Sequence, residues 1–357
     1  MRSVTKQTLN VTNRQKGFSL IELMIAMVLG MVLMAGALQV FLGVKKTFVF
    51  NSDMASMQES ARFAMEFITR DARMAGYFGC GSQALKNTLN PSAGLGTWQF
   101  QFDQGLVGYD GDDADFPVAD FPVADLPSLS SGVMPNSDVF TVLRGATEGD
   151  SFTVDSHNIA TSVIEVTSNH AYAAGRILMV SDCDHAAIFQ ITGITADTIT
   201  HNAGALVPGN CTIDLGLPGS CSANTYEYGG DASVMEVTSN AYYVDTAPNN
   251  VPTIYRQQIL GGVDSTTEEL VQGIESIQVL FGVDINGDGV ANRYTLASSV
   301  TNWTTVVSLR LHLLARSLTQ VTSEPVDFRF VGTTYSPSDN YLRKEFITTV
   351  KVRNRGV

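Results

Sequence analysis

The longest hydrophobic pattern in the chain is an apolar run over residues 18–44 that contains a single ionisable side chain, Glu22. As an α-helix this run would reach about 40 Å, which is enough to cross a bilayer with some tilt. After it, apolar and small residues recur at three- and four-residue steps, which predicts that the helix continues with one face buried. No proline interrupts the pattern and Gly76 is a natural stop, so we expect one helix from about Ser19 to Ala75. The predicted buried face consists of Met54, Met57, Ala61, Ala64, Ile68 and Ala72.

Beyond Gly76 the pattern changes to short apolar or alternating segments that are rich in Val, Ile, Thr and Phe. Gly, Asn, Asp and Pro separate them, as is typical of antiparallel strands joined by turns. We therefore expect an α+β fold, with a long N-terminal helix whose membrane-spanning first half is followed by a second half packed on a mostly antiparallel β-sheet head. The segments that predict strands are residues 139–143, 176–180, 187–192, 304–314 and 345–352.

Residues 86–135 differ from these segments and are expected to form a loop insertion in the head. The pentapeptide Phe-Pro-Val-Ala-Asp occurs twice in tandem over residues 116–125, among aspartates and without a base. Prolines at matching positions exclude a central strand. A solvated surface insertion is the favoured interpretation, and a partner-binding loop over residues 103–125 is the alternative.

The distribution of charge predicts how the chain is oriented in a membrane. Residues 1–17 carry four bases and no acid, a charge of +4, whereas the whole chain carries −13. By the positive-inside rule the N-terminus stays cytoplasmic and the C-terminal bulk is exported. The acidic remainder would repel a polyanion, so nucleic acid is not an expected partner.

A basic segment followed by an apolar one is also the pattern of a secretory signal peptide. Two features argue against that interpretation: Gly17 precedes the apolar region instead of following it, and the run is too long for a signal peptide. A lone carboxylate in hydrocarbon is costly and is expected to pair with a cation. Glu22 is therefore a functional candidate, with an interfacial residue that reaches water as the alternative.

The segment Gly17-Phe18-Ser19-Leu20-Ile21-Glu22 resembles the cleavage site of type IV prepilins and pseudopilins. The resemblance implies that a prepilin peptidase cuts after Gly17 and that the new amino group of Phe18 is methylated. It implies that Glu22 neutralises the N-terminal amine of a neighbouring subunit during assembly. The chain would then comprise a cleaved leader (1–17), a membrane-spanning assembly half of the helix (18–44), a head-packed half (45–75) and a β-rich head (76–357).

Further landmarks are similar to PilW-type minor pilins, and J-type minor pseudopilins of type II secretion are similar too. These landmarks are residues 70–80 (Arg-Asp-Ala-Arg-Met-Ala-Gly-Tyr-Phe-Gly-Cys), residues 180–183 (Val-Ser-Asp-Cys) followed by Phe189-Gln190, the loop at Asp284, and the terminal Val352-Arg-Asn-Arg355. The resemblance implies a protein of the inner membrane, and then of the cell-surface pilus, that joins other minor pilins and primes polymerisation of the major pilin. It also implies a place near the pilus tip beneath a large adhesin. A J-type pseudopilin and a pilus-displayed adhesin that binds through residues 103–125 are the alternatives.

The chain has four cysteines, Cys80, Cys183, Cys211 and Cys221, all on the side expected to be exported. An even number of cysteines in an oxidising compartment predicts two disulfides rather than metal ligands. Three pairings are possible. We favour Cys211 with Cys221, which would close a Gly/Pro-rich loop, and then Cys80 with Cys183.

Residues 284–289, Asp-Ile-Asn-Gly-Asp-Gly, match the first half of a calcium loop. Asp284, Asn286 and Asp288 would supply side-chain oxygens, and the Val290 carbonyl is a further candidate. The twelfth position is Thr295 rather than Glu, so this is not an EF-hand. A β-turn is the alternative, because Asn-Gly and Asp-Gly favour hairpins on their own. The expected function requires no cofactor, and calcium is the ligand that this motif suggests.

No catalytic motif accompanies these features. The five histidines have no Gly-x-Ser-x-Gly context, and the chain has no phosphate-binding or dinucleotide-binding glycine motif. We therefore expect that the protein is not an enzyme, with a membrane-anchored hydrolase as a distant alternative.

Overall fold

The computed structural model describes residues 17–79, 85–90, 98–111, 137–147, 149–167, 170–204, 206–217, 219–246 and 249–355. The chain divides into two compact units, Met1–Ser52 and Asp53–Val357.

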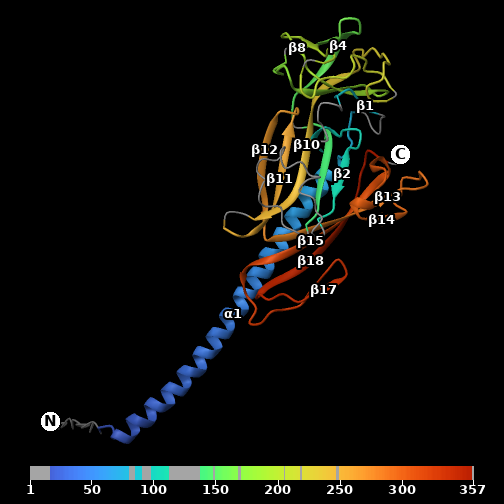
Figure 1. Cartoon of the computed structure of the whole chain (residues 1–357). Helices are drawn as coiled ribbons and strands as arrows, with labels where there is room; N and C mark the ends of the chain where they lie inside the picture. Colours follow the sequence, from blue (N-terminus) through green and yellow to red (C-terminus); the bar gives the residue numbers. More distant parts are fainter. Residues whose placement is uncertain are drawn as a thin grey trace, which may run out of the picture. The chain divides into compact units, whose positions relative to one another are not determined.

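One helix, α1 (Leu20–Arg73), extends over 54 residues and confirms the predicted long helix (Figure 1). It ends where the sequence predicts, because Gly76 adopts a φ of +67° that side chains with a Cβ rarely tolerate. The amide of Gly76 then donates to the carbonyl of Leu143 at 3.0 Å. Gly105 lies against this turn, and a Cβ on Gly105 would come within 2.9 Å of the Gly76 Cα. Both glycines are therefore required by the turn that ends the helix.

The larger of the two main sheets among the described residues has twelve strands, in the order β1-β7-β6-β10-β4-β5-β9-β8. Its remaining strands branch from β10: β11 and β3 both pair with β10, β12 pairs with β11, and β2 pairs with β3. All pairings are antiparallel except that of β1 with β7. The strands are β1 (Leu85–Asn87), β2 (Leu106–Tyr109), β3 (Val139–Gly145), β4 (Ser151–Asn158), β5 (Val163–Val166), β6 (Ile177–Ser181), β7 (Ala186–Gln190), β8 (Gly193–Ile194), β9 (Thr198–Thr200), β10 (Ser233–Thr246), β11 (Pro252–Leu260) and β12 (Asp264–Gln272).

The second sheet is antiparallel and has the order β14-β13-β15-β18, and we call it the C-terminal sheet. Its strands are β13 (Ile274–Val283), β14 (Arg293–Thr295), β15 (Val306–Gln320) and β18 (Tyr341–Lys351). A hairpin of β16 (Phe328–Phe330) and β17 (Thr333–Tyr335) lies beside β18 (Figure 1). Short 3₁₀ helices occur at Trp98–Phe100, Ala297–Ser299 and Trp303–Thr305. The long helix and the mostly antiparallel head confirm the predicted α+β fold.

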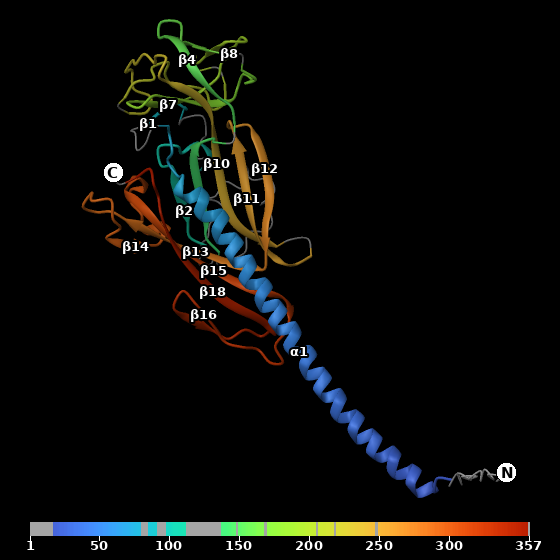
Figure 2. The same cartoon turned by 180° about the vertical axis from the view of Figure 1, so that it is seen from behind.

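From Asp53 onward α1 packs on both sheets, as both views of the head show (Figures 1 and 2). The predicted face is buried at Met57, Ala61, Ala64, Ile68 and Ala72, and Met54 is partly buried against the same cluster. That cluster includes residues of β2, β3, β10, β13, β15 and β18, so the helix fills the space between the two sheets.

A second hydrophobic cluster forms the core of a part of the head that we call the distal module (residues 149–232). This module contains β4 to β9 and the segment that leads into β10, and it lies beyond the C-terminal end of α1 (Figures 1 and 2). Its core is lined by Val154, Ile164, Leu178, Phe189, Ile199 and Tyr228, among others.

In the expected loop insertion at residues 86–135, the described residues include most of β1, the first 3₁₀ helix and all of β2. The tandem repeat of residues 116–125 lies outside the described residues.

Candidate assembly site

The first unit presents an apolar helix whose described side chains are exposed along its length. Each residue from Gly17 to Val49 is exposed, and the Phe18 side chain is 89% exposed. The helix is long and apolar enough to cross a membrane. Contiguous exposed apolar surface of this extent marks a lipid or protein contact.

Glu22 lies in the first turn of α1 and caps it. Its Oε2 accepts a hydrogen bond from the Ser19 amide at 3.1 Å. Ser19-x-x-Glu22 is the spacing of a capping box, in which the glutamate satisfies an amide that has no partner within the helix. This capping role was not among the predictions, although the Ser-x-x-Glu spacing is present in the sequence. A carboxylate has about four acceptor positions, so Glu22 retains the capacity to bind a cation as well.

A buried polar network holds the second half of α1 to the large sheet, and its central residue is Asp71. One Asp71 oxygen accepts from Arg144 Nε at 2.8 Å. The other accepts from Asn240 Nδ2 at 2.7 Å and from the Tyr242 hydroxyl at 2.9 Å. The side chains of Arg144 and Asp71 are only 5% and 7% exposed. Burial, and then the Asp71 carboxylate, raise the pKa of Tyr242, so its hydroxyl stays protonated and donates.

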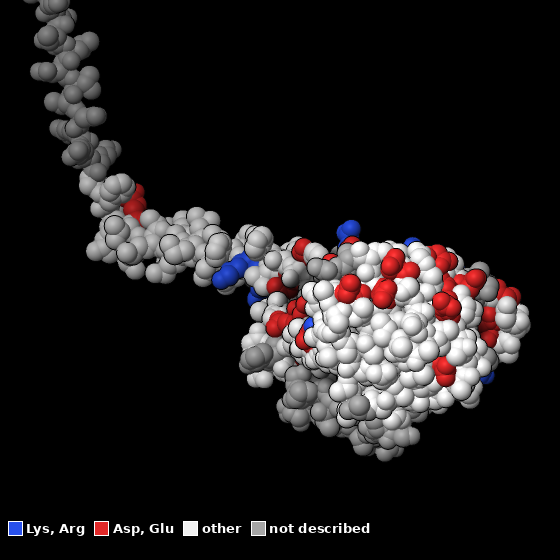
Figure 3. Space-filling model, turned by 90° about the horizontal axis from the view of Figure 1, so that it is seen from above, with Lys and Arg blue, Asp and Glu red and all other residues white. Residues whose placement is uncertain are grey.

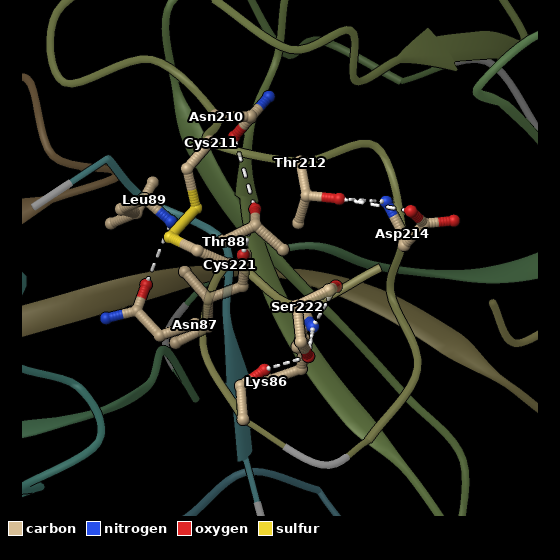
Figure 4. The surroundings of a disulfide bond; sticks show 12 residues. Lys86, Asn87, Thr88, Leu89, Asn210, Cys211, Thr212, Asp214, Cys221 and Ser222 are labelled. Carbon is tan, nitrogen blue, oxygen red and sulfur yellow. Dashed lines mark hydrogen bonds between the residues drawn. A yellow bond between two sulfur atoms is a disulfide. The ribbon is translucent and has the colours of Figure 1, made fainter. Parts of the chain in front are cut away.

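The expected disulfide between Cys211 and Cys221 is present and closes a loop of the distal module, with Cα atoms 5.4 Å apart (Figure 4). The Cys211 amide donates to the Thr88 carbonyl at 2.8 Å. Lys86 is buried, and its Nζ donates to the Ser222 carbonyl and hydroxyl, each at 2.7 Å. Burial lowers the pKa of the Lys86 ammonium, which the nearby Asp214 partly opposes. The disulfide loop is thus held to β1 and the residue after it.

Cys183 is also disulfide-bonded. Its expected partner, Cys80, lies outside the described residues.

The candidate calcium loop connects β13 to β14, and its own amides bind the Asp284 carboxylate. Asp284 Oδ1 accepts from the amides of Asn286 at 3.1 Å and Gly287 at 2.7 Å, and Oδ2 accepts from Gly289 at 2.7 Å. Burial favours a higher pKa for Asp284, but these amide hydrogen bonds outweigh it and hold the pKa below its usual value.

The other predicted calcium ligands lie in the same loop. Asn286 Nδ2 donates to Asp288 Oδ2 at 3.0 Å, and the Val290 amide donates to Asp288 Oδ1 at 2.9 Å. Among the described residues no group of three or more His, Cys, Asp or Glu side chains is placed to hold a metal ion. The hydrogen bonds by themselves account for the turn, and calcium binding stays a prediction that depends on the Asn286 and Asp288 oxygens and the Val290 carbonyl.

Acidic side chains dominate the charged surface of the head as seen from above (Figure 3). The imbalance is largest at residues 146–232, which contain ten acids and a single base, Arg176. The Arg176 guanidinium is itself paired with Glu236 and Asp264. Such a surface repels polyanions.

Two comparisons with known families fit this arrangement. Residues 12–38 match the prokaryotic N-terminal methylation motif, and residues 241–354 match the family described as Type IV Pilus-assembly protein W. A methylation motif that leads into a long apolar helix, followed by an antiparallel β head, defines a type IV pilin-like protein. Within that class, residues 241–354 are similar to the PilW-type minor pilins. The comparisons with curated proteins and with solved structures gave no significant match.

These matches point to a structural, non-enzymatic protein that associates with other pilus components and is anchored in a membrane by α1. The PilW match begins within β10 and extends past β18, so it includes the C-terminal sheet and leaves out the distal module.

Replacing Asp71 with alanine should destabilise the head strongly. The change removes the Asp71 carboxylate from the buried Arg144 guanidinium, and removing one member of a buried ion pair costs about 3–5 kcal/mol. Urea unfolding of residues 53–357, followed by tryptophan fluorescence, measures the loss. Glu59→Ala, an exposed change on the same helix, is the matched control and should lie within about 0.5 kcal/mol of the parent. Equal stabilities for the two variants would show that the network does not hold the helix.

Calcium should raise the melting temperature of the same fragment by a few degrees if the loop at Asp284 binds it, because a ligand that binds the folded state stabilises it. Asp288→Ala should abolish the rise and retain the Asp284 hydrogen bonds that close the turn. Asp231→Ala, at an exposed acid of the distal module, is the control. A melting temperature that is the same in calcium and in a chelator would leave a hydrogen-bonded turn as the whole role of the loop.

Proposed function

We propose that this minor pilin helps to initiate type IV pilus assembly as part of a priming complex with other minor pilins at the inner membrane, and then stays near the pilus tip. The observation that carries the proposal is the exposed apolar half of α1 behind a methylation motif, in a chain whose C-terminal sheet matches the PilW family. A subunit with such a helix has to transfer it from lipid to a protein environment when it joins a filament.

In this proposal a prepilin peptidase removes residues 1–17 on the cytoplasmic face, and the amino group of Phe18 is methylated. The new cationic terminus lies at the positive end of the α1 dipole. Glu22 of a neighbouring subunit can accept from that terminus, because its hydrogen bond to Ser19 uses only part of its acceptor capacity. The pair would let both charges enter an apolar filament core together.

The head-borne part of α1 offers a second contact for a neighbouring helix. Phe63 and Phe67 are 50% and 44% exposed, and their i,i+4 spacing places both rings on one side of the helix. Two exposed aromatic rings on one side of a helix can pack against a neighbouring apolar helix, because helix contacts use side chains at i and i+4. We assign these rings to the contact with the apolar helix of an adjacent pilin.

Deletion of the gene and complementation with variants tests the proposed role. Loss of pili on deletion, with secretion intact, is the expected result. Loss of protein secretion would instead indicate a J-type pseudopilin, and normal pili without attachment would indicate an adhesin.

Complementation with Glu22→Ala should leave leader removal intact, as seen by a mass shift on gels, and restore few or no pili. Glu59→Ala should restore them fully, and normal piliation with Glu22→Ala would remove the neutralisation argument.

The double variant Phe63→Ser/Phe67→Ser should fold normally and fail to assemble. Because both rings are half exposed in the isolated chain, the free energy of unfolding should change by less than about 1 kcal/mol. Pilus counts in the complemented strain should fall several-fold. Ile347→Ser replaces another half-exposed apolar residue, on β18, and serves as the control. Equal pilus counts for the two variants would contradict the assigned contact.

A further inference from the structure

Two histidines contact each other in the interior of the distal module. His157 lies in β4 and His201 follows β9, and their Nε2 atoms are 3.2 Å apart. The residues are 4% and 1% exposed. Their rings pack against Tyr228 and Phe189, both of which belong to the core of the module. The contact therefore brings four separate segments of the module together around one buried point.

One arrangement of protons satisfies the contacts of both rings in the neutral state. The Tyr228 amide lies 3.4 Å from His157 Nδ1, and in the tautomer that accepts this bond the His157 proton is on Nε2. His157 Nε2–H then donates to His201 Nε2, which leaves the His201 proton on Nδ1. This Nδ1 is buried and finds no hydrogen-bond partner among the described residues. A proton added to His201 Nε2 would face the Nε2–H of His157 and break the bond between the rings.

The groups around the pair offer little compensation for a positive charge. From the segment before β10, Glu227 and a backbone hydrogen bond with Tyr226 favour a charged His157, whereas the phenols of Tyr226 and Tyr228 stay neutral because their pKa values are raised. From the other sides the pair meets the Phe189 ring of β7 and, through the His201 amide, the Ser162 carbonyl at 2.9 Å. Burial outweighs Glu227 and lowers the pKa of His157, and burial together with His157 lowers the pKa of His201 to about 3.

We propose that the His157–His201 contact is an acid-sensitive joint that holds the distal module closed near neutral pH and lets it open in mild acid. The module has its own hydrophobic core, separate from the one that binds α1 to the two sheets. Opening would thus expose the segments around β4, β9 and Tyr228 and leave the helix-bearing part of the head folded.

The direction of the pH dependence follows from proton uptake. In the open form both histidines regain an ordinary pKa of about 6.5, so opening binds protons and becomes more favourable as the pH falls below that value. For one group that titrates near 6.5 when open and near 3 when closed, the opening equilibrium should rise about 30-fold between pH 7.5 and pH 5.0.

Hydrogen–deuterium exchange of the full chain in detergent, corrected for intrinsic exchange at each pH, measures this opening. Peptides from residues 151–166 and 224–232 report on the joint, and peptides from residues 306–320 report on the C-terminal sheet. His157→Phe/His201→Phe removes both titrating groups and keeps aromatic rings in the core. His201→Gln supplies a non-titrating acceptor for His157 and serves where the double variant folds poorly. His312→Gln, in the C-terminal sheet, is the matched control.

In the parent chain and in His312→Gln, exchange in the module peptides should increase about 30-fold at pH 5.0, whereas exchange in the C-terminal sheet should not change. In His157→Phe/His201→Phe the increase should fall below about threefold, and in His201→Gln it should be smaller than in the parent, because only His157 still titrates. The proposal is overturned if the module peptides exchange equally at both pH values. It is also overturned if the variants keep the increase of the parent, or if the C-terminal sheet opens together with the module.

Discussion

The bond between the Asp71 carboxylate and the Arg144 guanidinium fixes how the long helix lies on the head. Asp71 is also held by Asn240 and Tyr242, which belong to the central strand β10. A one-turn slide of the helix would separate these groups inside a core where no water can replace them, at a cost of several kcal/mol. Close packing of small residues such as Ala61 and Ala64 adds to this preference, because a buried face packs well in few registers. We infer that the buried charge pair contributes specificity beyond that packing.

Strand β10 connects the Asp71 network to the rest of the head, because residues of β10 belong to all four hydrophobic clusters of the described residues. Tyr242 and Val244 face the cluster around α1, and Val234 lies in the core of the distal module. Val237 and Ala241 belong to the two smaller clusters. Two residues near the C-terminus also bind the end of α1 and the start of β15. The Arg353 amide donates to the Arg73 carbonyl at 3.1 Å. The Arg355 guanidinium donates to the carbonyls of Trp303 and Val306.

Sequence patterns predicted the elements of this fold better than its contacts. The periodicity from Met54 to Ala72 gave the buried face of α1, and the alternating segments gave strands such as β3 and β15. The Cys211–Cys221 bond followed from a short Gly/Pro-rich interval. The Asp71 network and the His157–His201 pair could not be read in this way. Asp71 lies 73 residues from Arg144 and 169 from Asn240, the two histidines are 44 residues apart, and these groups meet only in the tertiary fold. Two local patterns in the sequence do indicate contacts of this kind. An acid, Asp71, on the apolar face of a helix indicates a buried polar partner, and Ser19-x-x-Glu22 indicates a capping box.

The head has one hydrophobic core in the distal module and another around α1, and the family match follows this division. The PilW match leaves out the distal module, whereas α1 is held by a cluster drawn largely from the matched strands β10, β11, β12, β13, β15 and β18. Changes in the module reach that cluster mainly through β10, where residues 233–236 pair with β4 and β6 and residues 237–242 pair with β3. The segment of residues 146–232, which has ten acids and one base in its sequence, can therefore change in charge or open locally, while Asp71 keeps α1 in register. The proposed assembly through the helix and the opening of the module are then separable properties of one chain.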